Sequence, residues 1–506
     1  MPQTLVPQTR SRGRAVDILD ASGRPFPRQA PPPTSLRGWQ AARVDRLNQA
    51  HWQHAHGMPI NEDLRRDLQT LCTFCEFEAQ NNPMVAGVIA THANDVVGPD
   101  GPTLQIHSDN DAYNTALEQI HEEWFAMPDF LGQLSGADML KLDVRLKWTR
   151  GEYLEQFVDA GPDWMIGLRL HAIAPRRLST PPGRMLDTQL GISLDKFGRP
   201  LAYWIEDIDE RSPFGWTGRY IDPAPGPADI IHGFERLEPG QVRGVPLLAS
   251  ALDCIADLRD YDAQVLDAAR NAADYGVYFY TDHPNLDPII VNESIEIERR
   301  MATTAPPGWK PSMVQATQPT TNYVEFRSER QRDIGRPVGM PLMSIRLDSS
   351  QHSYSSARFD GQVYQRGCVS IRSQLEREKL NRCLDLLARE AEMAGLIPPR
   401  PRRVKYAWTW MPFPHVDPAR EMLAAQLRLQ TGISSLSDEI AATGGNIETL
   451  AAKRKRDAEV LAAAGFTYTI SQGGIQTITS ELDKLDKADQ TAAASTSRAY
   501  FAGAVQ

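Results

Sequence analysis

The chain has 506 residues, of which 41% are hydrophobic, so it is long enough to bury a sizeable core and to form several domains. Its 54 Lys and Arg residues against 64 Asp and Glu residues give a formal net charge of −10, which disfavours non-specific adhesion to DNA or to anionic membranes. Five cysteines do not make a disulfide framework, and no stretch approaches the roughly 18 apolar residues of a membrane span, so we expect a soluble intracellular protein.

The first part of the chain changes from a polar arm to helices. Residues 1–37 are rich in Arg, Pro and Ser without apolar periodicity, which predicts a flexible arm. After Asn61, a plausible N-cap, apolar side chains recur at three- and four-residue steps, which predicts a helix. The stretch NNPMVAGVIATHANDVV predicts a second helix that runs into a Gly-Pro-Asp-Gly turn and an extended segment.

The middle of the chain mixes strands with helices. Residues 150–235 consist of short apolar runs separated by turns, and Asp195–Gly198 has the signature of a β-hairpin, so we predict a small β-rich module. Helical periodicity returns from Val245 to about Asp274. A strand-like run and a Pro-rich loop then precede a predicted short helix over residues 321–335.

The last third is mostly helical. A loop containing GRPVGMPLMS precedes a predicted helix of about forty residues from Ser355 to Gly395. An extended segment follows, and residues 417–465 are again predicted to be helical. The tail beyond Ser471 is rich in Ala, Ser and Thr, which predicts mobility.

The serine-rich stretch SSQHSYSSARFD could hold a nucleophile. A catalytic serine needs a base and an oxyanion hole, and its usual sign, G-x-S-x-G, does not occur here. Ser355 or Ser356 instead lies where a helix begins, so we interpret the stretch as a helix start. A serine hydrolase or maturation protease using Ser353–Ser356 with His352 is the alternative.

Other motifs favour neither a metal site nor a cofactor site. Cys72 and Cys75 form a C-x-x-C pattern without a second pair to complete a zinc site, and both fit the apolar face of their helix. His51, His54 and His56 have no carboxylate or Cys partner at a recognised spacing. Phosphate-loop, dinucleotide and H-E-x-x-H motifs are absent, so we predict no cofactor, no metal and no catalytic residue.

Five aspartates form a row on the helix predicted from Val245. At about 100° per residue, their steps of four, three, seven and seven keep them within one stripe. Like charges in one row repel each other, so the stripe must face water. It is either an ordinary solvated face or the wall of an aqueous channel in a soluble ring. Its members are Asp253, Asp257, Asp260, Asp267 and Asp274.

Two basic clusters are candidate DNA contacts, although surface loops and helix faces carry such runs routinely. They comprise Arg400, Arg402, Arg403, Lys453, Arg454, Lys455 and Arg456.

Several phrases in series carry a resemblance to a known family. They are NNPMVAGVIATHANDVVGPDG, GEYLEQF, IAPRRLSTP, GISLDKFGRPLAYWI, IIHGFERLEPGQVRGVPLLASAL, SYSSAR and TGISSLSDEIAATGGN. In order and spacing they resemble the lambda-type family of tailed-bacteriophage portal proteins, also called head-tail connectors, over residues 38–465. The resemblance implies a mixed α+β, mostly helical fold with wing, stem, clip, tunnel loop and crown, assembled as a ring of usually twelve subunits.

The resemblance also implies an assignment of segments. In chain order these are a flexible arm 1–37, a wing 38–244 with the β-rich module 150–235, a first stem helix 245–274, a clip 275–320, a second stem helix 321–335, a tunnel loop 336–354, a long wing helix with its return strand 355–415, a crown 416–470 and a mobile tail 471–506. The part of the tunnel loop expected at the narrowest point of the channel is Pro341, Leu342, Met343, Ser344, Ile345 and Arg346.

A portal protein of this family is expected to form the channel at one capsid vertex. DNA is packaged through it by the terminase and later ejected, without sequence specificity. The expected partners are the terminase large subunit at the clip, a head-tail adaptor, and major capsid and scaffold proteins, with no membrane. The protein would be in the virion, and in the host cytoplasm during assembly. ATP hydrolysis belongs to the terminase, so no enzyme is expected; a helical scaffolding protein, a third option, would not need the β-rich section.

Overall fold

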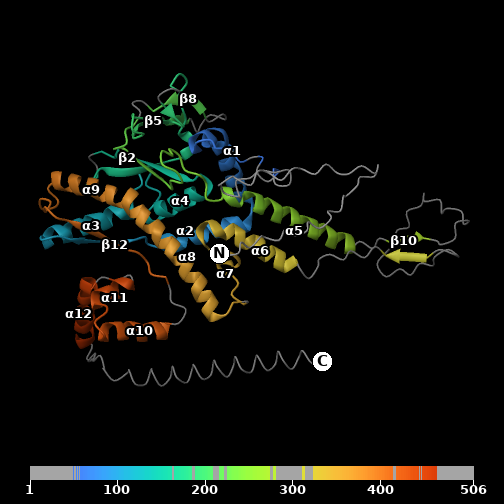
Figure 1. Ribbon diagram of the computed structural model, residues 1–506. Coiled ribbons are helices and arrows are strands. Elements are labelled where there is room, and N and C mark those ends of the chain that lie inside the picture. Colours follow the sequence, from blue (N-terminus) through green and yellow to red (C-terminus); the bar gives the residue numbers. More distant parts are fainter. Residues whose placement is uncertain are drawn as a thin grey trace, which may run out of the picture. The chain divides into compact units, whose positions relative to one another are not determined.

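The computed structural model describes residues 57–161, 164–184, 188–208, 216–221, 225–273, 277–280, 310–313, 323–350, 352–413, 418–443 and 447–463, with a few single residues besides. The chain divides into two units, Met1–Met58 and Pro59–Gln506, and little of the first is described. The predicted arm, the predicted tail and most of the predicted clip therefore lie outside the described residues. The second unit is mixed α+β and mostly helical, as the sequence predicts (Figure 1).

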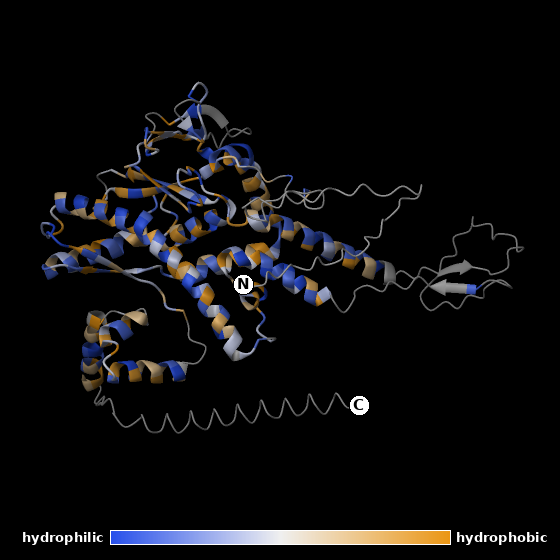
Figure 2. Cartoon of the chain, viewed as in Figure 1, coloured by the Kyte–Doolittle hydropathy of each residue, from blue (hydrophilic) through white to orange (hydrophobic). Residues whose placement is uncertain are grey.

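Four helices open the second unit and supply much of its main core. Buried side chains from α2 and α4 pack with those of α3, including Val85, Leu117, Leu140 and Trp148. Figure 2 shows hydrophobic and hydrophilic residues alternating along α1, α5 and α8, as expected for amphipathic helices. The bounds of the four helices are α1 (Ile60–Asn81), α2 (Pro83–Val97), α3 (Asp111–Ala126) and α4 (Gly136–Thr149).

The start of α1 differs by two residues from the prediction, since the N-cap is Pro59. The helix begins at Ile60, so Asn61 lies inside its first turn and is not the N-cap. The Asn61 side chain instead accepts a hydrogen bond from the Val242 amide at 3.1 Å and donates one to the Gly240 carbonyl at 2.9 Å. A tertiary contact therefore uses the side chain that the local pattern assigned to capping.

The predicted β-rich module is confirmed. Its main sheet is antiparallel in the order β3-β2-β9, and two small sheets follow, with orders β4-β5-β6 and β7-β8. The predicted hairpin joins β5 to β6, where the Asp195 carboxylate accepts hydrogen bonds from the amides of Phe197 and Arg199. The strands are β2 (Glu152–Asp159), β3 (Leu168–Ile173), β4 (Thr188–Gln189), β5 (Ile192–Leu194), β6 (Pro200–Tyr203), β7 (Glu206–Ile208), β8 (Trp216–Tyr220) and β9 (Ile230–Phe234).

The helix predicted from Val245 begins later, as α5 (Leu252–Ala273). The amides of Leu247 and Leu248 donate to the carbonyls of Lys147 and Trp148 at the end of α4, at 3.1 and 3.3 Å. These bonds hold the backbone away from helical geometry until a short 3₁₀ turn leads into α5. Two strands of the segment predicted as the clip, β10 (Val277–Tyr280) and β11 (Lys310–Met313), pair antiparallel. The short helix predicted next is confirmed as α6 (Tyr323–Gly335).

The segment after α6 is more ordered than the predicted loop. It holds a 3₁₀ turn, Arg336–Val338, and the short helix α7 (Leu342–Arg346). The long helix that follows is continuous but changes geometry in its middle. It consists of α8 (Tyr354–Leu375), the π turn Glu376–Leu380 and α9 (Asn381–Met393).

The remaining elements complete the chain order. The extended segment after α9 contains β12 (Lys405–Thr409), which pairs antiparallel with β1 (Thr103–His107). The predicted final helical region forms three helices, namely α10 (Pro418–Gln430), α11 (Leu436–Ala442) and α12 (Ile447–Ala463).

Candidate functional site

The helices α5 and α6 pack against each other through aromatic rings and through a hydrogen bond from the Cys254 thiol to the Arg330 carbonyl. Tyr261 of α5 lies against Tyr323 and Phe326 of α6, with ring centroids 5.8 and 4.6 Å apart. The Tyr323 hydroxyl donates to Asp262 at 2.8 Å, and Ile255 and Leu258 of α5 are buried. One face of α5 is therefore committed to packing within the chain.

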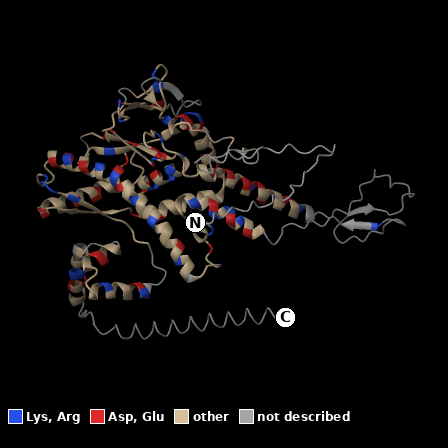
Figure 3. Cartoon of the chain, in the orientation of Figure 1, with Lys and Arg blue, Asp and Glu red and all other residues tan. Residues whose placement is uncertain are grey.

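The aspartates predicted to form a stripe lie on the exposed part of α5. Asp253, Asp257, Asp260 and Asp267 are all exposed, and Figure 3 shows the acidic residues along this helix. Asp267 pairs with Arg270 on its own helix at 3.1 Å, a solvated contact that contributes little to stability. Asp274 lies outside the described residues. The prediction that these carboxylates face water holds for the four described members; that the water is a channel remains a prediction.

The residues predicted for the tunnel loop form α7 and its entry. Leu342 and Ile345 are 9% and 8% exposed, and the Ile345 side chain packs so closely on Gly335 that a Cβ there would clash. Pro341, Met343 and Ser344 are half-buried, whereas Arg346 is exposed and donates to Ser328 of α6 at 3.1 Å. The segment is thus fixed to α6 at its base. Leu347, directly after α7, is 82% exposed and has a left-handed backbone with φ 52°.

The two basic clusters differ in their surroundings. Arg400 donates to Asp385 at 2.9 Å and to the Tyr406 hydroxyl at 3.1 Å, so its charge is engaged within the chain. Arg402 and Arg403 are exposed. Lys453, Arg454, Lys455 and Arg456 are exposed on α12. Of the seven residues in the two clusters, these six are exposed, so they can present their charge to a polyanion.

The serine-rich stretch caps a helix. Ser353, and not the predicted Ser355 or Ser356, is the N-cap of α8, and its hydroxyl accepts from the Ser356 amide at 3.3 Å. The Ser353 hydroxyl lies within hydrogen-bond distance of the hydroxyls of Ser355 and Ser356, and Nδ1 of His352 has no hydrogen-bond partner among the described residues. A serine activated by a base is therefore not formed, and nothing supports the hydrolase alternative.

The cysteines and histidines do not form a metal site in the described part of the chain. Cys72 and Cys75 are buried on the apolar face of α1, as predicted. Burial raises the pKa of the Cys72 thiol to about 11 and that of the Cys75 thiol to about 12. No group of three His, Cys, Asp or Glu side chains there could hold a metal ion. His51, His54 and His56 lie outside the described residues. No helix in the described ranges has both the length and the apolar content to cross a bilayer.

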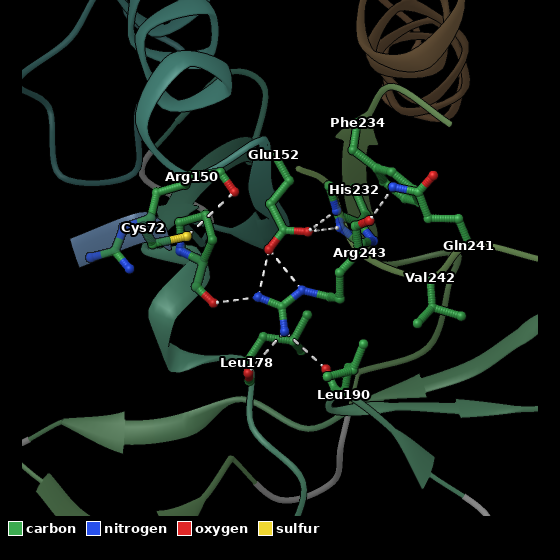
Figure 4. A network of polar contacts seen from close by, with 12 residues as sticks. Cys72, Arg150, Glu152, Leu178, Leu190, His232, Phe234, Gln241, Val242 and Arg243 are labelled. Atoms are coloured by element: carbon green, nitrogen blue, oxygen red, sulfur yellow. Dashed lines mark hydrogen bonds and ion pairs between the residues drawn. The ribbon is translucent and has the colours of Figure 1, made fainter. Parts of the chain in front are cut away.

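A buried polar network, which the sequence did not reveal, joins the β-rich module to the segment that follows β9 (Figure 4). Arg243 pairs with Glu152 and also donates to the carbonyls of Pro175, Leu178 and Leu190. The other oxygen of Glu152 lies 3.0 Å from Nε2 of His232. The signals in the sequence were single charged residues inside the apolar runs GEYLEQF and GQVRGVP, but their partners are far away in the chain.

A second buried network, also missed, lies at the π turn. Lys379 is held between Asp143 of α4 and Glu155 of β2. The first network ties β2 to the segment that leads into α5, and the second ties the π turn to α4 and β2.

Comparisons with known proteins place the chain in a family. The family model described as "Phage portal protein, lambda family" matches residues 46–372. The chain belongs to this family of phage portal proteins.

Three curated relatives are similar over most of the chain. The probable portal protein of Halomonas phage phiHAP-1 is 24% identical over 442 residues, which cover 80% of this chain and 83% of the relative. The portal protein of Escherichia phage N15 is 22% identical, with 76% and 83% covered. Portal protein B of Escherichia phage lambda is 21% identical, with 65% and 69% covered.

Two solved structures of gene transfer agent (GTA) particles match part of the chain. The neck of an empty GTA particle, computed with C6 symmetry, matches with a TM-score of 0.48 and 14% identity, covering 75% of this chain and 94% of that one. The neck of a native GTA particle, computed with C12 symmetry, matches with a TM-score of 0.47 and 15% identity over the same shares.

Proposed function

We propose that copies of this chain assemble into a ring, usually of twelve subunits, whose central channel conducts double-stranded DNA through one vertex of the phage head. The observation that carries the proposal is the division of α5 into two faces. One face buries Ile255 and Leu258 within the chain, whereas the other exposes a row of carboxylates. Because the chain belongs to the portal family, we interpret the exposed acidic face as the face that lines the channel.

A conduit must not bind the polymer that it conducts. Carboxylates repeated in every subunit would repel the DNA phosphates, so the polymer would slide with few trapped states. We therefore propose Asp253, Asp257 and Asp260, with Asp267 and Asp274 further along, as the channel wall. The exposed Arg402, Arg403 and α12 cations are candidate DNA contacts elsewhere on the path.

The other segments follow from the same assignment. In this proposal α5 and α6 are the two stem helices, and β10 with β11 belongs to the clip, where the terminase large subunit would bind. The segment around α7 is the tunnel loop, with Arg346 and Leu347 at its exposed end and Leu342 and Ile345 as its anchor. The three helices α10–α12 form the crown.

The proposed role is structural and not enzymatic. The protein would be mounted in the virion, after assembly in the host cytoplasm with major capsid and scaffold proteins, and would carry a head-tail adaptor. The motor chemistry would be supplied by the terminase.

Negative-stain imaging of the purified full-length protein tests the assembly. We expect rings with a central hole, together with a light-scattering mass of about twelve chains, since a heterologous interface closes into a ring when its rotation allows. A stable monomer at micromolar concentration would contradict the proposal.

A further inference from the structure

The turn that joins α8 to α9 has π geometry and carries a buried lysine. Lys379 is 2% exposed, and its Nζ donates to Oδ2 of Asp143 and to Oε1 of Glu155, each at 2.6 Å. Asp143 comes from α4 and Glu155 from the following strand β2, so one ammonium group ties the π turn to two elements that lie 236 and 224 residues earlier in the chain. Single π turns inside α-helices occur frequently at functional positions.

The cluster has fewer donors than two ionised carboxylates need. Asp143 and Glu155 are each 1% exposed, and Oε2 of Glu155 has no hydrogen-bond partner among the described residues. A buried carboxylate oxygen without a donor is costly, because it has lost its water without gaining a hydrogen bond. Protonation of one of the two carboxyl groups would remove one negative charge and supply one more hydrogen-bond donor.

The cluster and the charged groups around it together include one more carboxyl group than cations. The charged and titratable groups that face the cluster come from every neighbouring element: Lys147 of α4, Tyr153 of β2, Glu378 of the π turn, Arg382 and Cys383 of α9, and Glu235 after β9. Lys147 is already bonded to Gln374, at 3.0 Å. Together with the central three residues, four carboxyl groups face three cations, and one added proton balances them.

The direction of the pKa shifts agrees with this count. Burial, and next the neighbouring Glu155 carboxylate, raise the pKa of Asp143 well above its ordinary value of 3.8 despite the opposing effect of Lys379. Burial lowers the pKa of Lys379, but the two carboxylates outweigh it and raise the pKa above 10.5, so the lysine stays an ammonium.

We propose that Asp143, Glu155 and Lys379 form a latch that holds one proton, and that loss of this proton to water releases the π turn from α4 and β2. With the proton present, one carboxylate and one ammonium are balanced. Without it, two negative charges share one ammonium in a site of low dielectric constant, where like charges repel strongly. The π turn then loses its attachment to α4 and to the β3-β2-β9 sheet.

Hydrogen exchange at the amides of residues 376–380 tests the latch in the full-length protein. After correction for the intrinsic exchange rates, the opening constant of these amides should rise about tenfold per pH unit from the ordinary Asp pKa up to the raised one, since one proton is released on opening. Above the raised pKa it should level off. Opening that does not depend on pH in the wild type would overturn the proposal without any variant.

Three variants identify the groups that hold the proton. Asp143→Asn keeps a neutral side chain that can donate to Glu155, so the pH dependence should disappear. Glu155→Gln removes the oxygen that lacks a partner and should also abolish the pH dependence of the opening constant. Having two such variants keeps the test decisive if one of them fails to fold. Asp138→Asn changes an exposed carboxylate on the same helix and should retain the wild-type slope. A slope that persists in Asp143→Asn and Glu155→Gln, or vanishes in Asp138→Asn, would show that the proton is held elsewhere.

Discussion

Arg243 and Glu152 form a buried ion pair in which Nε of the arginine lies 2.7 Å from Oε1 of the glutamate, although 91 residues separate them. Burial alone would raise the pKa of Glu152, but Arg243 and His232 outweigh it and lower the pKa to about 2. The pair ties β2 to the chain that follows β9, and the further hydrogen bonds of Arg243 hold the loops after β3 in place. It therefore joins the β-rich module to the segment that leads into α5.

Glu152→Gln should strongly destabilise the protein. Removing one partner of a buried pair leaves an uncompensated charge, which typically costs about 3–5 kcal/mol. In the wild type this contribution is present above the ordinary Glu pKa of 4.5 and is lost as the pH falls towards 2. Urea unfolding of both proteins at neutral and acid pH measures it. Asp63→Asn, which breaks an exposed pair with Arg66, is the matched control and should change stability by less than about 1 kcal/mol. A similar small loss in Glu152→Gln would contradict the role given to the pair.

Two buried histidines should make stability depend on mildly acid pH. Nδ1 of His92 accepts from Trp148 at 2.8 Å, and burial lowers the pKa of His92 and that of His121 to about 4. The unfolded chain binds protons at these sites below pH 6.5 and the folded chain does not. As the pH falls from 6.5 to 4, the unfolding constant should therefore rise about tenfold per pH unit for each histidine.

His92→Gln tests this assignment, because glutamine can still accept from Trp148 but does not titrate. The pH slope of thermal or urea unfolding should be smaller by one proton than in the wild type. His107→Gln changes an exposed histidine at the end of β1 and should leave the slope unchanged. Equal slopes in the wild type and His92→Gln would refute the buried neutral histidine.

The acidic row on α5 can be tested by reversing its charge. If Asp253, Asp257 and Asp260 line a channel, changing all three to Lys should make the wall capture phosphates and release counterions, so DNA retention rises at low salt and fades as salt is added. Rings should still form, because exposed charges contribute little to packing.

Packaging assays at two salt concentrations measure this effect. Asp63→Lys with Asp67→Lys on α1 changes charge outside α5 and serves as the control. Unchanged packaging by the triple variant at low salt would favour an ordinary solvated face.

The anchor and the exposed end of the α7 segment should respond in opposite ways. Leu342→Ala removes a buried side chain and should cost about 2–5 kcal/mol. Leu347→Gly removes an exposed side chain whose left-handed backbone costs about 1–2 kcal/mol in an L-residue, so stability should hold or rise slightly. Urea midpoints of both variants measure the contrast, and a large loss in Leu347→Gly would mean that this side chain is packed.

The predictions from sequence were correct where the cause is local. The Asp195–Gly198 turn specifies its hairpin through hydrogen bonds within four residues, and repulsion along one helix was enough to predict that the row of aspartates on α5 is exposed. The predictions failed where distant contacts decide. The start of α5 is delayed by backbone bonds to the end of α4, and α7 is a helix because Leu342 and Ile345 find a core that no local pattern reveals.

The buried networks were missed for the same reason. The sequence shows Arg243 in a largely apolar run and Lys379 in a charged stretch, but not that carboxylates 91, 224 and 236 residues away will neutralise them. The family resemblance was nevertheless recognisable, because it depends on the order of short phrases and not on any one contact.

The pairing of β1 with β12 has a consequence for synthesis on the ribosome. Thr103 aligns with Thr409, so β1 must wait for about 300 further residues before its partner strand exists, or about 15–60 s at ordinary translation rates. During this interval an open strand edge is a template for pairing with other nascent chains. The Glu118 carboxylate, only twelve residues from the amide of Ile106, accepts its hydrogen bond at 2.6 Å. This bond coexists with the β12 pairing, so Glu118 occupies the edge of β1 that faces away from β12. Since α3 emerges directly after β1, this side chain can cover that second edge long before β12 arrives, which reduces the strand edge that the unfinished chain exposes.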